Sequence, residues 1–428
     1  MDRTQSQVNE FTKVERYSLL CIGVLLFQTV RNINLVLYMV VLFFSYALLY
    51  INFFFNRSAI KVKFIFSKIL FLFTLFCIPI VSLGHIPINE YLVALPRYLV
   101  TLPMIIFLAL YKDYRFKYIN SVLKLFVVFI LFASLSIPYQ IIFGPITFLA
   151  EMSYRGGLER YASLAGSLTA LGTLGAYALA ISLFLGDRLF NKKISLSVNT
   201  LICIGMLMTL QKAAIINILL ILTIFLFWRL RIKKLVKIIF LAILIYGSYL
   251  ILQKSLNDFF LVQYIETIVN YSFTQNDVGT ANDLLKRLWY YTENMITINK
   301  VTTLGLFIGI GFKALSGTMG LPHHPMLHNN YYDLLFSGGI LHLISFLIIA
   351  ARIPMKVFYK KITKRQYSTY EFIYASIVIL ILINMLIGGS SFYQPVVSVI
   401  TFFVVFSYDY ISVSHNGLRK VEKINDND

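Results

Sequence analysis

Long apolar runs separated by short polar segments constrain this chain more than any other feature. Runs of about 17 to 25 residues recur along it, and each can cross roughly 30 Å of hydrocarbon. Lipid offers the backbone no hydrogen-bond partners, so such runs must cross it as helices. The sequence therefore predicts an all-α polytopic membrane protein with about twelve transmembrane helices, in the ranges 17–30, 33–55, 65–83, 91–111, 119–143, 168–185, 194–210, 213–228, 238–252, 331–351, 370–387 and 395–413.

The composition excludes other classes of protein. Of the 428 residues 58% are hydrophobic and only 13% are charged, which is too little charge to cover a soluble core. The net charge of +19 comes mostly from short basic clusters between the apolar runs, so it indicates membrane topology and not a nucleic-acid partner. Cys21, Cys77 and Cys203 lie inside apolar runs and are expected to be small core residues.

The basic clusters also predict the orientation. Lys13 and Arg16 precede the first run, which lacks an obvious cleavage site and is expected to be retained as a helix. With the N-terminus in the cytoplasm, every alternate segment is basic, so both termini are expected to be cytoplasmic. We expect one transmembrane domain over 1–428, with a first periplasmic loop at 144–167 and a large periplasmic loop at 253–330.

Several cations depart from this charge bias, because the predicted topology places them at or near the outer surface. One explanation is that they extend to lipid headgroups. The other is that they converge on a phosphate or diphosphate, for which arginine supplies paired donors. These cations are Arg97 in the fourth helix, Arg155 and Arg160 in the first loop, Lys212 in the turn before the eighth helix, and Lys286 and Arg287 in the large loop.

The end of the large loop is rich in polar side chains. Three of the six histidines, His323, His324 and His328, lie just before the helix at 331–351. They could form a metal site, supply a general base near neutral pH, or be surface residues without a function. Upstream, Gly309 and Gly311 resemble a fragment of a dinucleotide-binding fingerprint, but tight backbone packing at the membrane surface is the favoured interpretation because a βαβ context is lacking.

The order of these motifs is similar to that of a known superfamily. Arg287-x-Trp289 comes first, Gly309-x-Gly311 follows, and His328-Asn329-x-Tyr331 leads into Leu-Leu-x-x-Gly-Gly-Ile at the start of a helix. From about residue 150 to 345 the chain resembles the O-antigen polymerase and O-antigen ligase superfamily. The Thr-Leu-Gln-Lys turn resembles that superfamily's Ser-Arg turn, with Lys212 in place of arginine and hence without a bidentate fork.

The resemblance implies a metal-independent, inverting glycosyltransferase of the bacterial inner membrane that needs no cofactor. It would transfer a growing glycan from undecaprenyl diphosphate to a lipid-linked repeat unit at the periplasmic face. Its expected partners are this lipid-linked oligosaccharide, the bilayer and a chain-length regulator protein. The expected catalytic base is His328, and the expected diphosphate-binding or sugar-binding residues are Arg97, Arg155, Arg160, Lys212, Arg287, Asn329 and Tyr331.

Two alternatives stay open at this point. An O-antigen ligase, which transfers the polymer to lipid A-core, would share the same loops and motifs, and polymerase is favoured because polymerases are the more numerous and divergent group. A flippase or other transporter of lipid-linked oligosaccharide would instead be expected to carry charges inside its helices and to have short outside loops. The predicted helices here are nearly free of charge, and the largest loop is outside.

Overall fold

The computed structural model describes most of the chain apart from much of the predicted large loop. The described residues are 12–55, 66–112, 114–149, 152–155, 158–168, 170–209, 211–229, 303–315, 319, 321, 329–363, 368–387 and 393–425. Every predicted helix within these residues is helical, whereas 238–252 lies outside them.

The described chain is built of helices, with one short hairpin. The first part contains α2 (Lys13–Leu26), the 3₁₀ helix η1 (Gln28–Asn32), α3 (Leu35–Phe55), α4 (Phe66–Ser82), α5 (Ile88–Leu99), α6 (Leu102–Leu110) and α7 (Phe116–Phe143). The strands β1 (Ser153–Arg155) and β2 (Leu158–Arg160) follow, then α8 (Ala170–Leu189), α9 (Lys192–Met208) and α10 (Lys212–Arg229). The last part contains α14 (Thr303–Ile308), η3 (Gly311–Leu315), α16 (Asn330–Ile362), α17 (Thr369–Ile387) and α18 (Pro395–Asn425).

Length and apolar composition make this a multi-pass membrane protein. Among the described residues, five helical stretches can cross a bilayer: Leu35–Phe55, Ile88–Leu110, Phe116–Phe143, Asn330–Ile362 and Thr369–Leu386. Four shorter apolar helices accompany them: Phe66–Ser82, Ala170–Gly186, Ala213–Phe225 and Pro395–Ile411. The α3 helix illustrates the arrangement, since Leu42 and Leu49 are buried while Val36 and Phe44 on its other side are more than 60% exposed. In a membrane that exposed side faces lipid, and contact with lipid carries no free-energy cost for an apolar surface.

The predicted helix at 91–111 is corrected to two helices, α5 and α6, which meet at Val100 and Thr101. Pro103 stands in the first turn of α6. Its nitrogen has no N–H to donate to the carbonyl of Leu99, and its ring crowds that carbonyl, which favours a break in the helix at this point.

Two predicted helix ends are also corrected. The α16 helix continues to Ile362 and α18 to Asn425, beyond the predicted ends at 351 and 413. Their last turns are basic and not apolar. The length of a helix is therefore not limited to its apolar part, because lysine and arginine are good helix formers in water.

The first loop contains a β-hairpin that the all-α prediction did not include. Strands β1 and β2 pair antiparallel, with Ser153 opposite Arg160 and Arg155 opposite Leu158. Gly156 and Gly157 separate the strands in the sequence, and such a pair is a known signal for a two-residue hairpin loop.

Charged side chains pair at one end of the helices. Glu15 accepts hydrogen bonds from Arg115, the first of them from Nε at 2.9 Å. Asp409 binds both Lys68 Nζ at 3.2 Å and Arg352 Nη2 at 2.8 Å. Lys360 Nζ lies 2.6 Å from Glu371 Oε1. We call this region the ion-pair end. Arg115, Arg352 and Lys360 come from segments predicted to be cytoplasmic, and Lys68 lies in the first turn of α4, next to another such segment.

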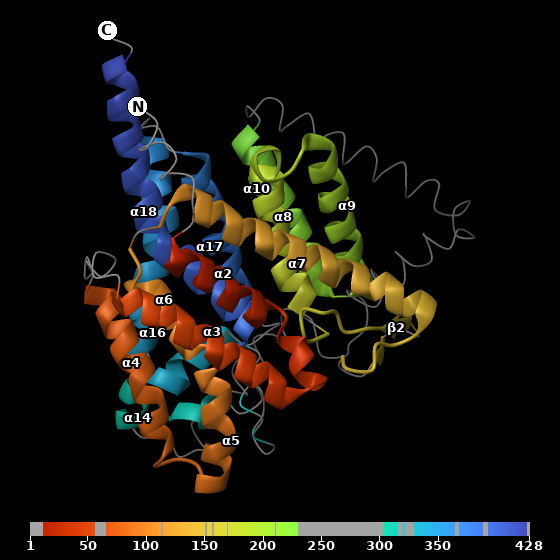
Figure 1. Cartoon of the computed structure of the whole chain (residues 1–428), viewed down its shortest axis with the longest axis vertical. Coiled ribbons are helices and arrows are strands. Elements are labelled where there is room, and N and C mark those ends of the chain that lie inside the picture. The colour runs from red at the N-terminus through yellow and green to blue at the C-terminus, as the bar shows by residue number, and fades with distance from the viewer. Residues whose placement is uncertain are drawn as a thin grey trace.

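The opposite end of the helices carries the loops that matter below. The helices α2, α4 and α7 begin near the ion-pair end, and α16 and α18 end there. Figure 1 shows α18 projecting from one end of the molecule, while α5, α14 and β2 lie away from that end. Helix α16 packs on both α4 and α17, and α8 packs on α9, α10 and α17.

Candidate functional site

The start of α16 follows directly on the predicted catalytic motif. Asn329 is buried and caps the helix, since its side-chain Oδ1 accepts from the backbone N–H of Tyr331 at 3.0 Å. Tyr331 is half-buried, and its hydroxyl donates to the carbonyl of Leu382 in α17 at 2.8 Å. Asp333, also buried, stands in the first turn. Asn329 and Tyr331 thus fix the point at which the chain after His328 enters the helix.

The α16 helix is broken in its third turn. Gly339 has a φ of +81° and a ψ of 178°, which are not helical values. The short segment α14–η3 packs into this break, where the backbone N–H of Ile310 donates to the carbonyl of Phe336 at 2.6 Å. Broken helices at membrane depth need such partners for their backbone groups, and they often border binding sites.

The glycines of the Gly-x-Gly element explain how this packing is possible. Both have positive φ, +85° at Gly309 and +68° at Gly311. A Cβ on Gly309 would lie 2.3 Å from the carbonyl oxygen of Ser337, and one on Gly311 would lie 2.1 Å from Ser82 Oγ. The favoured interpretation of this element, tight backbone packing, is confirmed.

A fully buried histidine lies beside the break. The Nδ1 atom of His342 is 2.7 Å from Thr74 Oγ1 in α4, and its Nε2 is 2.8 Å from the hydroxyl of Tyr393. The imidazole also stacks on the ring of Phe71, with centroids 4.5 Å apart. Both ring nitrogens are therefore engaged, so this histidine joins α16, α4 and the segment before α18.

The first loop is anchored through Arg160 to the turn between α9 and α10. Its Nε donates to the carbonyl of Thr209 at 3.0 Å, and its Nη2 donates to that of Leu168 at 3.2 Å. The predicted diphosphate ligand Arg160 is thus brought to the turn that carries Lys212, the first residue of α10. At least two of its five donors are used by the main chain, so Arg160 holds the first loop in place.

Two arginines, and a histidine beside a lysine, lie at this same end. Arg31 of η1 is half-buried, and burial together with the charge of Arg97 lowers the pKa of its guanidinium. Partial burial and the nearby charge of Lys313 lower the pKa of His85. Within the described part of the chain, none of these four side chains has an acidic ion-pair partner. We call this region the cation end, and it favours an anion because its cations repel one another.

Hydrogen bonds join the first loop to η1 at the cation end. Thr29 Oγ1 in η1 donates to the carbonyl of Leu164, and Asn32 Nδ2 donates to that of Phe148 at 2.8 Å. The first loop therefore packs on the same short helix that carries Arg31. On the other side, Asn217 of α10 and Asn384 of α17 exchange hydrogen bonds of 2.9 and 3.1 Å inside the bundle.

Some predicted site residues lie outside the described residues. These are His328 and Arg287, together with His323, His324 and Lys286. For Arg155 in β1 and Lys212 at the start of α10, the structure describes the backbone and not the side chain. Their roles stay predictions.

Arg31 and His342 are two candidate residues that the sequence analysis missed. Arg31 lies between the first two predicted helices, on the predicted outside. It therefore departs from the charge bias just as Arg97 and Arg160 do. His342 is an ionisable residue within a predicted transmembrane helix, which is by itself a signal of function.

The arrangement can bind an anion beside lipid. Arg97 is exposed on α5, as is Val93 one turn earlier on the same side of the helix. An anionic group carried on a hydrocarbon chain could therefore reach Arg97 from the membrane without crossing the protein. A comparison of the chain with models of protein families finds no match, and a comparison with curated proteins finds no relative.

Proposed function

We propose that this protein is a polysaccharide polymerase of the O-antigen type. It transfers a growing glycan from undecaprenyl diphosphate to the non-reducing-end hydroxyl of a lipid-linked repeat unit, at the periplasmic face of the bacterial inner membrane. The proposal rests on the motif order from Arg287 to Tyr331 and on the geometry of the cation end.

One structural observation carries most of this support. Arg31 and Arg97 come from different segments, burial and the charge of Arg97 lower the pKa of the Arg31 guanidinium, and neither arginine has an acidic ion-pair partner among the described residues. Like charges placed together cost free energy unless an anion joins them. A diphosphate is such an anion, and a polyprenyl carrier would bring it along the exposed side of α5.

The proposed reaction needs two kinds of assistance. The hydroxyl oxygen of the acceptor attacks the anomeric carbon of the donor sugar, and the bond from that carbon to the diphosphate oxygen breaks with its electron pair going to the diphosphate. Cations stabilise the charge that develops on this leaving group. The hydroxyl proton passes to a general base, for which His328 is the candidate.

The proposed topology places this chemistry outside the cytoplasm. Three basic residues of the ion-pair end, Arg115, Arg352 and Lys360, belong to segments that the positive-inside rule assigns to the cytoplasm. Reporter fusions after Lys193 and Lys237 should therefore report the cytoplasm, and a fusion near Gln275 should report the periplasm. An external signal at Lys237 would contradict this topology and with it the proposed site.

A deletion strain separates the polymerase from its alternatives. Loss of long glycan chains with a single repeat unit still attached to the lipid core supports a polymerase, whereas loss of everything beyond the core indicates a ligase or flippase. Purified protein in liposomes with a polyprenyl-diphosphate-linked repeat unit provides the direct test. A ladder of longer products is expected, and its absence with an authentic donor would overturn the proposal.

A further inference from the structure

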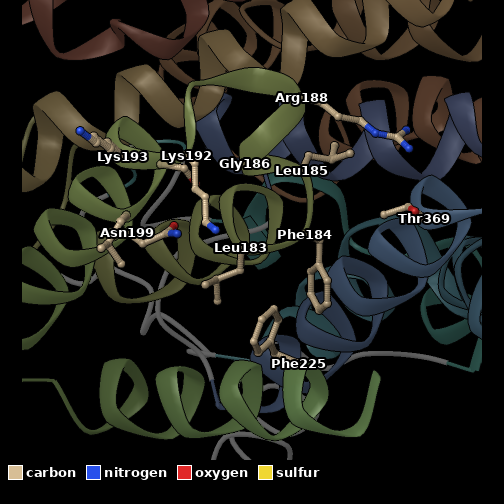
Figure 2. Close-up of a pocket in the computed structure, with 12 residues that line it drawn as sticks. Leu183, Phe184, Leu185, Gly186, Arg188, Lys192, Lys193, Asn199, Phe225 and Thr369 are labelled. Carbon is tan, nitrogen blue, oxygen red and sulfur yellow. The ribbon is translucent and has the colours of Figure 1, made fainter. Parts of the chain in front are cut away.

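A pocket of about 720 Å³ opens at the other side of the molecule from the cation end, between α8, α9, α10 and the start of α17. Its position is that of the predicted cytoplasmic turn between α8 and α9. Figure 2 shows the side chains that line it. This pocket is independent of the proposed glycan transfer, because none of the candidate site residues line it.

The polar part of the pocket is cationic. Arg188, Lys192 and Lys193 line it, and no acidic side chain is among its described lining residues. Lys192 points into the pocket toward Asn199 in Figure 2, whereas Lys193 points away from it. Arg188 is held at the rim, with its guanidinium carbon 5.4 Å from the centre of the Tyr370 ring. Lys192 is therefore the residue best placed to meet an anion inside.

The first turn of α9 adds to this preference. Lys192 and Lys193 are its first two residues, and the N-cap Asn191 makes no side-chain hydrogen bond to the turn. The positive end of a helix dipole disfavours cations at this position. An anion at this turn would offset both the dipole and the two ammonium groups.

Apart from Ser195, Asn199 and Thr369, the remaining lining is apolar or glycine, and it reaches the exposed surface of α9. Phe184 of α8 and Phe225 of α10 pack with ring centroids 5.6 Å apart on the inner side of the pocket. Leu196 lines the pocket and is 70% exposed on the surface of α9. A ligand with a charged head and a hydrocarbon chain matches a pocket that is cationic on one side and apolar on the other.

Asn199 indicates that the headgroup of such a ligand carries a hydrogen-bond donor. Its Oδ1 atom is buried and has no hydrogen-bond partner among the described residues. A buried acceptor of this kind needs a donor. A phosphodiester carries no proton at neutral pH, but a glycerol headgroup attached to it carries hydroxyls that can donate.

We propose that this pocket binds an anionic phospholipid with a hydroxylated headgroup, of the phosphatidylglycerol class, from the cytoplasmic leaflet. Lys192 binds the phosphate, and Asn199 accepts from a headgroup hydroxyl. The acyl chain leaves the pocket along Phe225 and Leu196 toward the bilayer.

The test measures lipid binding by the purified full-length protein in a neutral detergent. Native mass spectrometry gives the fraction of protein carrying one lipid during titration with phosphatidylglycerol, or with phosphatidylcholine of the same acyl chains. A parallel thermal-shift titration uses inorganic phosphate. We expect phosphatidylglycerol to bind at least tenfold more tightly than phosphatidylcholine, and we expect phosphate alone to produce no comparable stabilisation.

Matched variants locate the binding. Lys192→Gln should weaken phosphatidylglycerol binding about tenfold, the loss of one charge-assisted hydrogen bond. Lys13→Gln is the control, because Lys13 is also an exposed lysine in the first turn of a helix but lies outside the pocket. Lys192→Arg should retain binding, which guards against a folding defect. Equal affinity for the two lipids, an equal effect of phosphate, or equal losses in Lys192→Gln and Lys13→Gln would each overturn the proposal.

Discussion

The two ends of the helix bundle use charge in opposite ways. At the ion-pair end, Glu15, Asp409 and Glu371 each bind at least one lysine or arginine. At the cation end, the charge of Arg97 lowers the pKa of Arg31 and the charge of Lys313 lowers that of His85, with no acid paired to these side chains in the described part of the chain. Paired charges hold helices together, whereas cations that repel one another are stabilised by a ligand. The comparison therefore predicts that substitutions at the first end change stability and that substitutions at the second change activity.

The largest effect is expected at His328, next to the buried cap of α16. His328→Ala should abolish polymer formation while leaving the amount of protein in the membrane unchanged, because a general base contributes about a hundred- to ten-thousand-fold to the rate. The measurement is the chain-length ladder made by purified protein from a polyprenyl-diphosphate-linked donor.

Two controls make that result specific to a general base. His323→Ala should be mild, because His323 does not belong to the His-Asn-x-Tyr element. Chelators should have no effect on the ladder. Full-length polymer from His328→Ala would refute the assignment, and activity that is lost on chelation and restored by a divalent metal would favour the metal interpretation of the histidine cluster.

The second effect concerns the close backbone packing of α14 against the break in α16, rather than the charged side chains of either end. A Cβ at Gly339 would lie 1.9 Å from the carbonyl oxygen of Phe307, in a backbone with positive φ. Gly339→Ala should therefore lower the free energy of unfolding by about 3 kcal/mol and displace α14 from α16. Thermal unfolding in detergent measures this loss. Gly23→Ala is the matched control, since a Cβ there meets nothing within 4 Å and should be neutral or stabilising.

The third effect breaks the ion-pair end. Asp409→Asn leaves Lys68 and Arg352 close together without their shared anion, and the Lys68 side chain is only 11% exposed. Removing one partner from a largely buried ion pair should cost about 2–3 kcal/mol of stability. Activity per folded molecule should stay unchanged. Glu90→Gln, which removes an acid without a described ion-pair partner, should cost less than about 1 kcal/mol, and an equal loss in both would contradict the role of Asp409.

The sequence predicts the helices far better than their contacts. Apolar runs predict helices because lipid leaves the backbone no alternative, and this holds for each predicted range that the structure describes. The break between α5 and α6 was signalled only by Pro103, and proline is tolerated in many membrane helices. A count of apolar residues could not predict the basic extension of α16.

The sequence predicts which cations belong to the candidate site, but it does not predict their contacts. The positive-inside rule separates Arg97 and Arg160 from the cytoplasmic cations, yet it cannot show that the charge of Arg97 lowers the pKa of Arg31, 66 positions away in the sequence. Nor does it show that Arg160 binds the carbonyl of Thr209. Such contacts depend on how helices pack, and a single sequence carries no direct record of which helices are neighbours.

The smallest effect is expected from the cation pair itself, and it tests the comparison most directly. Arg97→Gln should lower polymerase activity about tenfold, the value of one lost charge-assisted contact to the carrier diphosphate. The free energy of unfolding should stay the same or rise, because removing Arg97 relieves its repulsion of Arg31. Arg97→Glu sharpens the test, since it would convert the cation pair into an ion pair. This variant should gain up to about 1 kcal/mol of stability and lose activity, which is the pattern of the ion-pair end. Lower stability in Arg97→Gln at unchanged activity would mean that both ends use their charges to hold the fold.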